Sequence, residues 1–556
     1  MRSFMNNQET RVIATLGPSF CEQNDIEQAI NLGVRIFRQP LAYRDQDHLS
    51  EYTMIKEIEV NLGKRCFIVP DFPSNRLRVG RINDSREYRP NDEVVIIDKS
   101  ESHIHQEIPL PGIKNYTGSI SVGDSLAIRD GNVLIRITER KGSLLSGIII
   151  HAKQKIKSNN NASIINLDLD LEQITTDDMV YLKQLRDLGY VPEYIDVSFV
   201  KNVDEIRKCR QMLTEIFGNN VPRIIAKIET KEALDNLTSV CREADCIMVA
   251  RGDLVTVANI EEIPYLQHRI VSTCRMLNKP VIVATQMLEN FADTQIPNRS
   301  ELNDVALAVR QGASAIMLSR ETSGSSKPLE VIKLAKKIID LEMEKWPQHS
   351  ITKENRFPII AIEGVDGSGK TCTSRALTRA MKGHYISTPP KDYRPLRPFF
   401  EKDERSVRAR MLFYVGSLWE TWEEVVQECR KQPVILDRYT LSTMIYHETL
   451  LKEDLSSIYN YVFPPSADIN ISLDISEKTA LIRLKEKATK SFDADLENDR
   501  VLQKNLAEKF KKYSQYVINT DLLTKDQVVQ ECIKIINDNF NHDKNRAKQI
   551  PSVVVK

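Results

Sequence analysis

Short apolar runs recur along roughly the first 320 residues, and each is separated from the next by a stretch with helical periodicity. The runs are rich in β-branched residues, which is typical of parallel strands buried on both faces. Eight such runs are present, the number that closes a (β/α)8 TIM barrel. They are Val12–Leu16, Val34–Phe37, Cys66–Val69, Tyr194–Val197, Ile224–Ile228, Ile247–Ala250, Val281–Ala284 and Ala315–Leu318.

The regularity breaks once, between Gly80 and about Asn161. This segment has strand-like runs, Val94–Ile97 and Val133–Thr138, and a turn signal at Asp130-Gly131-Asn132. It predicts a small all-β domain, a small β-barrel, inserted after the third strand. Two interpretations stay open: a lid over the barrel mouth, or an insertion without a role in function.

A second α/β pattern begins at residue 357. The apolar run Phe357–Glu363 leads into Gly-Val-Asp-Gly-Ser-Gly-Lys-Thr, and the helical run Cys372–Met381 follows. This is the spacing of a P-loop, with the strand and helix that the motif requires on either side. Backbone N–H groups of such a loop surround phosphate oxygens, the lysine reaches the β/γ-phosphates and the hydroxyl faces Mg²⁺. The predicted residues are Gly364, Val365, Asp366, Gly367, Ser368, Gly369, Lys370 and Thr371, with Thr371 also a metal ligand.

Four more strand-like runs follow, at His384–Ser387, Pro433–Leu436, Ile469–Leu473 and Tyr516–Asn519. With the first they predict a five-stranded parallel sheet covered by helices on both faces, a P-loop three-layer α/β/α domain. The predicted domains are a barrel (1–82 and 161–345), an inserted β cap (83–160), a linker (346–356), the P-loop domain (357–545) and a tail (546–556).

Composition limits the classes of partner. The 77 basic and 77 acidic residues cancel among 556, with no long run of one sign, so we expect no nucleic-acid or membrane partner. No apolar run approaches the ~20 residues that span a bilayer. The first ten residues lack a signal-peptide pattern, and the nine cysteines lack metal-ligand spacing. We expect a cytoplasmic homo-oligomer with reduced thiols, while a mitochondrial location stays open.

Polar residues stand at or just after the carboxyl ends of the predicted barrel strands, where ligand sites of such barrels form. A lysine, several acids and hydroxyls at one rim suggest a divalent metal and a charged, oxygen-rich substrate. The set is Arg38, Asp71, Arg78, Lys227, Glu229, Asp253, Thr285 and Ser319.

Five blocks in this region resemble the signature sequences of pyruvate kinase, and the resemblance covers roughly residues 8–345. The family's usual C-terminal effector domain is missing. The blocks are Thr10-Arg-Val-Ile-Ala-Thr-Leu-Gly-Pro18, Ile225-Ala-Lys-Ile-Glu229, Met248-Val-Ala-Arg-Gly-Asp-Leu254, Ala284-Thr-Gln-Met-Leu288 and Ile316-Met-Leu-Ser-Arg-Glu-Thr322.

This resemblance implies phosphoryl transfer from phosphoenolpyruvate to a nucleoside diphosphate, followed by protonation of the enolate. Glu229 and Asp253 match the carboxylates that hold the divalent metal, and hard oxygen ligands suit Mg²⁺. Lys227 matches the lysine that stabilises the transferring phosphoryl group and the enolate oxygen. The other matched residues are Arg38 and Arg78 for phosphate, Thr285 for proton delivery, and Asp71, Arg76, Gly252 and Ser319 for substrate or nucleotide.

The chain departs from the family at the monovalent-cation site. Pro40, Ala42 and Phe72 stand where the family has an Asn, a Ser and a Thr, and Arg76 stands where potassium-dependent members carry a glutamate. Our hypothesis is that the Arg76 guanidinium supplies the fixed positive charge, so that K⁺ is not required.

Two further departures lie near the barrel mouth. Val255 and Arg320 stand where the family prefers glycine. The added bulk either narrows or redirects the substrate pocket, or marks a site that has decayed.

The C-terminal part, about residues 357–540, resembles the thymidylate kinase superfamily, and most of all its UMP-CMP kinase branch. The likeness to the superfamily rests on the P-loop and on Asp437-Arg438-Tyr439 after a predicted strand. The likeness to the UMP-CMP kinase branch rests on residues 408–414, the block Asp437-Arg-Tyr-Thr440 and residues 465–474. It implies that Asp437 organises Mg²⁺ or the acceptor phosphate and that Arg438 binds the monophosphate. Phe413 or Tyr414 either stacks on the base or belongs to the core.

The sequence does not decide which cationic residue of the lid contacts the transferring phosphoryl group. Relatives without an arginine in the P-loop place arginines in the lid, and here that region offers one arginine and several lysines, which are poorer bidentate clamps. They are Arg483, Lys485, Lys487 and Lys490.

The two halves together suggest a bifunctional nucleotide kinase. The P-loop domain would convert a (deoxy)nucleoside monophosphate, such as CMP, UMP or a dTMP-like substrate, to the diphosphate with ATP. The barrel would convert a diphosphate, ADP included, to the triphosphate with phosphoenolpyruvate. The alternatives are a catalytically silent barrel that acts as scaffold or sensor, and a nucleotide-binding module without catalysis.

Overall fold

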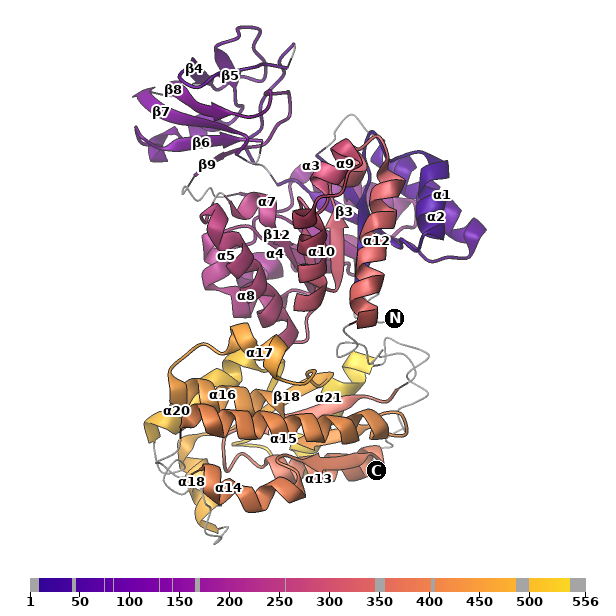
Figure 1. Cartoon of the computed structure of the whole chain (residues 1–556), viewed down its shortest axis with the longest axis vertical. Coiled ribbons are helices and arrows are strands. Elements are labelled where there is room, and N and C mark those ends of the chain that lie inside the picture. Colours follow the sequence, from indigo (N-terminus) through magenta and orange to yellow (C-terminus); the bar gives the residue numbers. More distant parts are fainter. Residues whose placement is uncertain are drawn as a thin grey trace.

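The computed structural model describes residues 10–42, 47–74, 76–83, 85–129, 131–142, 144–165, 171–255, 257–345, 356–401, 406–486 and 500–540. They form a closed barrel, a six-stranded cap sheet and a five-stranded α/β domain (Figure 1).

Eight parallel strands close the barrel in the order β1-β14-β13-β12-β11-β10-β3-β2, as predicted. The strands are β1 (Arg11–Thr15), β2 (Ile36–Pro40), β3 (Phe67–Phe72), β10 (Tyr194–Val197), β11 (Arg223–Ile228), β12 (Cys246–Ala250), β13 (Val281–Ala284) and β14 (Ala315–Leu318). The helices are α1 (Gln23–Asn31), α2 (His48–Leu62), α3 (Thr176–Asp187), α4 (Val203–Phe217), α5 (Lys231–Asp235), α6 (Leu237–Glu243), α7 (Arg251–Leu254), α8 (Ile263–Met276), α9 (Glu289–Thr294), α10 (Arg299–Gln311), α11 (Arg320–Ser323) and α12 (Pro328–Lys345).

Two strands extend beyond their apolar runs. β2 and β3 continue to Pro40 and Phe72 because the backbone stays in register with the neighbouring strands, with Pro40 opposite Asp71 and Asp71 opposite Asp196. Side chains alternate along a strand, so the residue two positions beyond an inward apolar residue also points inward. Tyr194 and Ile225 belong to the apolar barrel interior. Asp196 and Lys227, two positions further along the same strands, therefore also point inward, in the layer above.

The inserted cap has its own apolar core and a six-stranded sheet in the order β5-β4-β8-β7-β6-β9. The sheet is open where the sequence suggested a small barrel. Its strands are β4 (Glu93–Ile97), β5 (Glu107–Pro109), β6 (Ser125–Ile128), β7 (Val133–Lys141), β8 (Leu144–Ala152) and β9 (Ala162–Ile164). Figure 1 shows the cap at the end of the molecule farthest from the C-terminal domain.

The C-terminal sheet is parallel, in the order β16-β17-β15-β18-β19, which confirms the predicted fold. Helices α13 and α21 cover one face, while α15, α16 and α20 cover the other. The strands are β15 (Ile359–Gly364), β16 (His384–Ser387), β17 (Val434–Asp437), β18 (Ile469–Asp474) and β19 (Tyr516–Asn519). The helices are α13 (Lys370–Met381), α14 (Arg397–Phe400), α15 (Val407–Glu428), α16 (Thr440–Leu451), α17 (Ser456–Val462), α18 (Glu477–Glu486), α20 (Arg500–Tyr513) and α21 (Lys525–Phe540).

Most of the predicted linker, residues 346–355, and the predicted tail lie outside the described residues. Arg356, the last residue assigned to the linker, is buried and forms an ion pair with Asp468 at 2.7 Å. It therefore packs as part of the C-terminal domain.

The barrel and the C-terminal domain meet through the amino ends of their strands. Met276 of α8 packs into the C-terminal core, and the Asn278 amide, just before β13, donates to the carbonyl of Asp468, just before β18. The carboxyl ends of the barrel strands, on the side of the cap, therefore lie on the far side of the barrel from the C-terminal domain (Figure 1).

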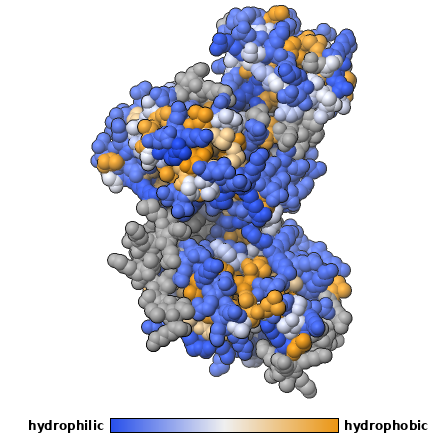
Figure 2. All heavy atoms as spheres, turned by 180° about the vertical axis from the view of Figure 1, so that it is seen from behind, coloured by the Kyte–Doolittle hydropathy of each residue, from blue (hydrophilic) through white to orange (hydrophobic). Residues whose placement is uncertain are grey.

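The surface is mostly hydrophilic on the face seen in Figure 2, with scattered hydrophobic residues and a constriction between the two large domains. None of the described helices is long and apolar enough to cross a membrane.

Candidate active sites

Four adjacent strands carry a row of charged residues in the layer above the barrel's apolar interior. They are Arg38 on β2, Asp71 on β3, Asp196 on β10 and Lys227 on β11. Asp71 accepts hydrogen bonds from Arg38 Nε at 3.0 Å and from Lys227 Nζ at 3.4 Å. Lys227 also donates to Ser198 Oγ at 2.9 Å. Arg38, Asp71 and Lys227 are thus joined in one network, and Asp196 is buried beside it.

Glu229 and Asp253 are buried side by side next to this row. Burial, together with the charge of Asp253, raises the pKa of Glu229 to about 7 although Lys227, whose Nζ lies 3.1 Å from Glu229 Oε1, opposes the shift. Glu229 Oε2 accepts the Phe199 N–H at 2.8 Å, while Oε1 has no hydrogen-bond partner among the described residues. Two adjacent acids, one of which resists ionisation without a cation, fit a divalent metal with hard oxygen ligands such as Mg²⁺.

Arg76 contacts the second of these acids directly. Its Nη1 lies 3.0 Å from Asp253 Oδ1, and its guanidinium lies over the Phe199 ring at 5.2 Å. Burial disfavours ionisation of Asp253, but Arg76 and Lys227 outweigh it and hold its pKa below the ordinary value. A fixed positive charge therefore stands at the edge of the metal site.

Thr285 reaches the same region through a strained turn. Thr285 and Gln286 have φ values of 70° and 52°. Thr285 Oγ1 accepts the Gly252 N–H at 2.9 Å, beside Asp253. The buried Arg251 holds the turn from below, because its Nε donates to the Thr285 carbonyl at 3.2 Å and its Nη1 pairs with Asp304 at 2.6 Å. Such strain at a strand end is common in functional sites.

Two predicted residues make other contacts. Arg78 Nη1 donates to the Asn159 carbonyl at 3.2 Å, where the chain passes between barrel and cap. Ser319 follows β14, and its N–H donates to Glu321 Oε2 at 2.8 Å. Their predicted substrate roles stay predictions. The neighbouring Arg320 pairs with Glu289 on α9 at 3.0 Å, so its side chain is held by acids at the barrel mouth.

The P-loop joins β15 to α13. Gly364 has φ +130°, and a Cβ there would lie 2.5 Å from the Leu473 carbonyl oxygen, so only glycine fits. Lys370 Nζ donates to the Val365 carbonyl at 2.7 Å and lies 3.4 Å from Asp366 Oδ1. Burial and the nearby charge of Arg438 lower the pKa of Lys370 to about 8. Gly367 and Gly369 also have positive φ, and the Thr371 side chain is partly exposed at the start of α13.

The predicted acceptor residues surround this loop. Asp437 ends β17 and accepts from the Tyr385 hydroxyl at 2.8 Å. Arg438, with φ +66°, pairs with Asp366, which also accepts from the Tyr446 hydroxyl at 3.0 Å. Arg438 therefore contacts the phosphate loop through Asp366, while the predicted substrate roles of Asp437 and Arg438 stay predictions.

The structure decides only in part whether Phe413 and Tyr414 belong to the core or are available to stack on a base. Phe413 is 9% exposed and stacks on Phe400 with centroids 4.5 Å apart. The Tyr414 hydroxyl contacts Glu401 and accepts from Arg397 Nε at 3.1 Å. One face of Phe413 is thus covered by protein.

The lid prediction falls mostly outside the described residues, which end at 486 and resume at 500. Arg483 is described on α18, and its Nη2 donates to the Thr520 carbonyl at 3.1 Å. The same helix packs on the P-loop, because a Cβ on Gly367 would lie 3.0 Å from the Ala480 carbonyl oxygen.

Sequence reasoning missed four residues of these sites. Asp196 is 1% exposed and neither of its carboxyl oxygens has a hydrogen-bond partner among the described residues; burial and Asp71 raise its pKa well above the ordinary value. An acid inside the apolar run Tyr194–Val197 was the available signal. Ser198 and Arg251 position Lys227 and Thr285. Glu363 accepts the Tyr439 N–H at 3.0 Å and fixes the turn after β17.

The fold and the sites define a protein built from two phosphotransferase-type domains, a (β/α)8 barrel and a P-loop α/β domain. The family model for the pyruvate kinase barrel domain matches residues 7–332, and the model for thymidylate kinase matches residues 362–532. The chain therefore belongs to the pyruvate kinase family and carries a thymidylate kinase domain after the barrel.

Individual relatives agree with this assignment. The chain is 29% identical to a pyruvate kinase of Thermotoga maritima over 60% of this chain and 70% of the relative. It is 30% identical to a pyruvate kinase of Thermococcus litoralis, over 60% and 69%. A crystal structure of Cryptosporidium parvum pyruvate kinase aligns with TM-score 0.56 and 19% identity, over 96% of this chain and 93% of that one. A structure from Pyrobaculum aerophilum gives 0.52 and 22%, over 69% and 87%. At these identities the structures show the fold alone.

Proposed function

We propose that the chain is a bifunctional nucleotide kinase that converts a nucleoside monophosphate to the triphosphate in two separate sites. The P-loop domain phosphorylates a monophosphate with ATP, and the barrel transfers phosphoryl from phosphoenolpyruvate to a nucleoside diphosphate. One observation supports both halves. Each parallel sheet ends in a buried lysine beside acids, Lys227 beside Glu229 and Lys370 beside Asp366.

In the barrel, Glu229 and Asp253 would hold Mg²⁺, which when bound neutralises phosphoryl and carboxylate oxygens of the substrate. Lys227 lies within 3.4 Å of both Asp71 and Glu229, so its ammonium is positioned for the transferring phosphoryl group and then for the enolate oxygen. Arg38 would exchange its bond to Asp71 for phosphate oxygens. The Thr285 hydroxyl, which accepts the Gly252 N–H at 2.9 Å, would relay a proton to the enolate carbon.

We also propose that the barrel works without potassium. Pro40 and Phe72 offer no side-chain oxygen, and the Arg76 guanidinium already stands 3.0 Å from the metal acid Asp253. The charge that a monovalent cation would bring is thus part of the chain.

In the P-loop domain, the glycine-lined loop would surround the ATP phosphates and Lys370 would contact the transferring group. Thr371 and Asp437 would hold Mg²⁺, which would neutralise charge on the phosphate oxygens. Arg438 would bind the acceptor monophosphate. CMP, UMP and dTMP are the acceptors we propose to test first. A homo-oligomeric state and a cytoplasmic location stay predictions.

The test is an assay of the whole chain with ATP, phosphoenolpyruvate, Mg²⁺ and one monophosphate at a time. We expect both nucleoside triphosphate and pyruvate to form. Diphosphate that accumulates without pyruvate would contradict the barrel's role, and no phosphorylation of any monophosphate would contradict the role of the P-loop domain.

A second candidate is a catalytically silent barrel that senses ligands for the P-loop domain. The bond from Arg76 to Asp253 favours it, because it occupies an oxygen that a metal would use. The discriminating measurement is pyruvate release from phosphoenolpyruvate and ADP by a Lys370→Ala chain. Release at wild-type rate rules out the silent barrel.

A further inference from the structure

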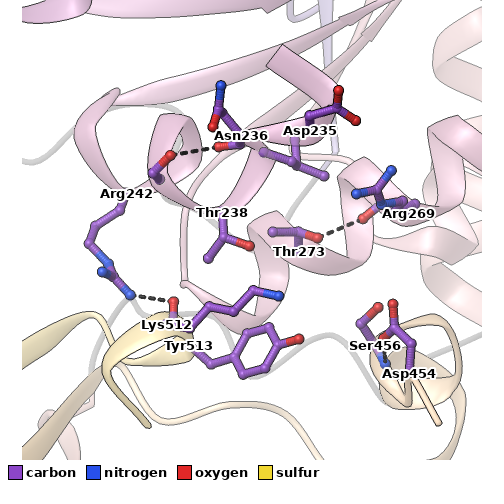
Figure 3. Close-up of a pocket in the computed structure, with 12 residues that line it drawn as sticks. Asp235, Asn236, Thr238, Arg242, Arg269, Thr273, Asp454, Ser456, Lys512 and Tyr513 are labelled. Carbon is purple, nitrogen blue, oxygen red and sulfur yellow. Dashed lines mark hydrogen bonds between the residues drawn. The ribbon is translucent and has the colours of Figure 1, made fainter. Parts of the chain in front are cut away.

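A polar cavity of about 330 Å³ lies where the barrel meets the C-terminal domain (Figure 3). Its walls come from α6 and α8 of the barrel, from the end of α20, and from the segment before α17. Both candidate active sites lie at the opposite ends of their sheets, so the cavity belongs to neither.

Three cationic side chains line the cavity. They are Arg242 and Arg269 from the barrel and Lys512 from α20. Among the described residues no acid forms an ion pair with any of the three. The Arg242 guanidinium donates to the Lys511 carbonyl at 2.5 Å and also to that of Lys512, and its Nε is buried with no hydrogen-bond partner in the part of the chain described. Within the described ranges, the one hydrogen bond that the Arg269 guanidinium donates goes to the Leu234 carbonyl, at 3.1 Å.

These contacts leave the positive charge incompletely balanced. The carbonyls at the carboxyl end of α20 carry only a partial negative charge, about half an elementary charge for a whole helix end. Burial lowers the pKa of Arg242, and no carboxylate acts in the opposite direction. A partly buried cation without an anion is costly, so an anion in the cavity would be stabilised.

The remaining walls supply hydroxyl groups and two acids. Thr238, Thr273 and Tyr513 line the space, and the Lys512 side chain extends into it between the two domains (Figure 3). Asp235 and Asp454 are exposed at the rim. The cations suit phosphate oxygens, while the hydroxyls and the rim acids suit the hydroxyl groups of an attached sugar.

We propose that this interdomain cavity binds a small phosphate ester, its phosphate between Arg269 and Lys512 with Arg242 behind it, and its hydroxylated part toward the rim. The volume lies at the lower end of the range of about 300–1,000 Å³ for small-molecule sites. Because both domains contribute cations, the ligand stabilises their docked arrangement and links the two active sites thermodynamically.

The experiment compares the full chain with the double variant Arg269→Gln/Lys512→Gln and with a matched control, Lys208→Gln/Lys504→Gln. The control removes two exposed charges from α4 and α20, and neither residue lines the cavity. Radiolabelled inorganic phosphate is titrated by equilibrium dialysis, and crystals are soaked in tungstate. We expect wild type and control to bind phosphate at the cavity with the same affinity, and the cavity variant to bind it at least tenfold more weakly. In wild-type crystals we expect a tungstate peak beside Arg242.

The single variant Lys512→Gln controls for misfolding of the double variant. Because Lys512 is exposed, this substitution should leave the fold intact and weaken phosphate binding only in part. Competition with a pentose phosphate and with a nucleoside monophosphate distinguishes the two sources of ester. Displacement of phosphate from the cavity by either one supports the proposal. Identical binding by cavity variant and control, tungstate only at the P-loop, or displacement by neither ester overturns it.

Discussion

The barrel site and the P-loop site draw their positive charge from different sources. In the barrel, Arg38, Lys227 and Arg76 are each already bonded to a carboxylate. In the P-loop domain, Lys370 bonds mainly to a backbone carbonyl, and burial with Arg438 lowers its pKa to about 8. A substrate of the barrel must therefore exchange ion pairs, whereas a substrate of the P-loop meets a lysine that is close to losing its proton.

Removal of each lysine should give the largest effects and separate the two activities. Lys227→Met removes the cation aimed at the transferring group, so pyruvate formation should fall by about 100-fold to 1,000-fold while diphosphate formation continues. Lys370→Ala should do the reverse. Coupled assays of both products, with circular dichroism to confirm folding, test this. A variant that loses both activities to the same extent would contradict the assignment of separate sites.

The sequence predicted the parts of each site that follow one strand, and missed the parts that depend on neighbouring strands. The lysine and acid of β11 and the P-loop are contiguous motifs. Asp196 becomes part of the barrel site only because β10 pairs with β3 in a register that sets it beside Asp71. Arg251 holds Thr285 from another strand end.

The potassium hypothesis sharpens the barrel half of the comparison. Arg76→Glu replaces a fixed cation beside Asp253 with an acid, so pyruvate formation should fall by roughly tenfold or more and recover in part when KCl is added. The control, Arg65→Gln, breaks an ion pair with Glu193 away from the mouth and should leave the KCl response unchanged. The measurement is pyruvate release against KCl concentration. A wild-type barrel that K⁺ strongly activates would refute the hypothesis.

The pH dependence sharpens the P-loop half. Because burial and Arg438 lower the pKa of Lys370 from 10.5 to about 8, its ammonium is charged below that pH and neutral above it. Above that pH, ATP binding requires protonation of Lys370. The affinity for ATP should therefore weaken above about pH 8, by up to about tenfold per pH unit. Titration of ATP binding from pH 6.5 to 9.5 measures this. Lys370→Arg, which stays charged, should bind ATP with little pH dependence over that range.

The arrangement of the domains predicts the smallest effect. A covalent link between two domains can raise the local concentration of an intermediate that both use. However, the domains meet through the amino ends of their strands, as the contact of Asn278 with Asp468 shows, and the carboxyl ends of the barrel strands lie on the far side of the barrel.

A diphosphate released at the P-loop must therefore leave into solution before it reaches the barrel. An equimolar mixture of Lys227→Met and Lys370→Ala chains, at wild-type concentration of each working site, should form triphosphate from monophosphate at about the wild-type rate. The time courses of pyruvate and diphosphate in the two reactions provide the comparison. Two results would contradict this expectation: triphosphate formation several-fold slower in the mixture than in wild type, or a wild-type time course without the lag that free diphosphate produces. Either would mean that the diphosphate passes directly between the sites, by a route this arrangement of domains does not provide.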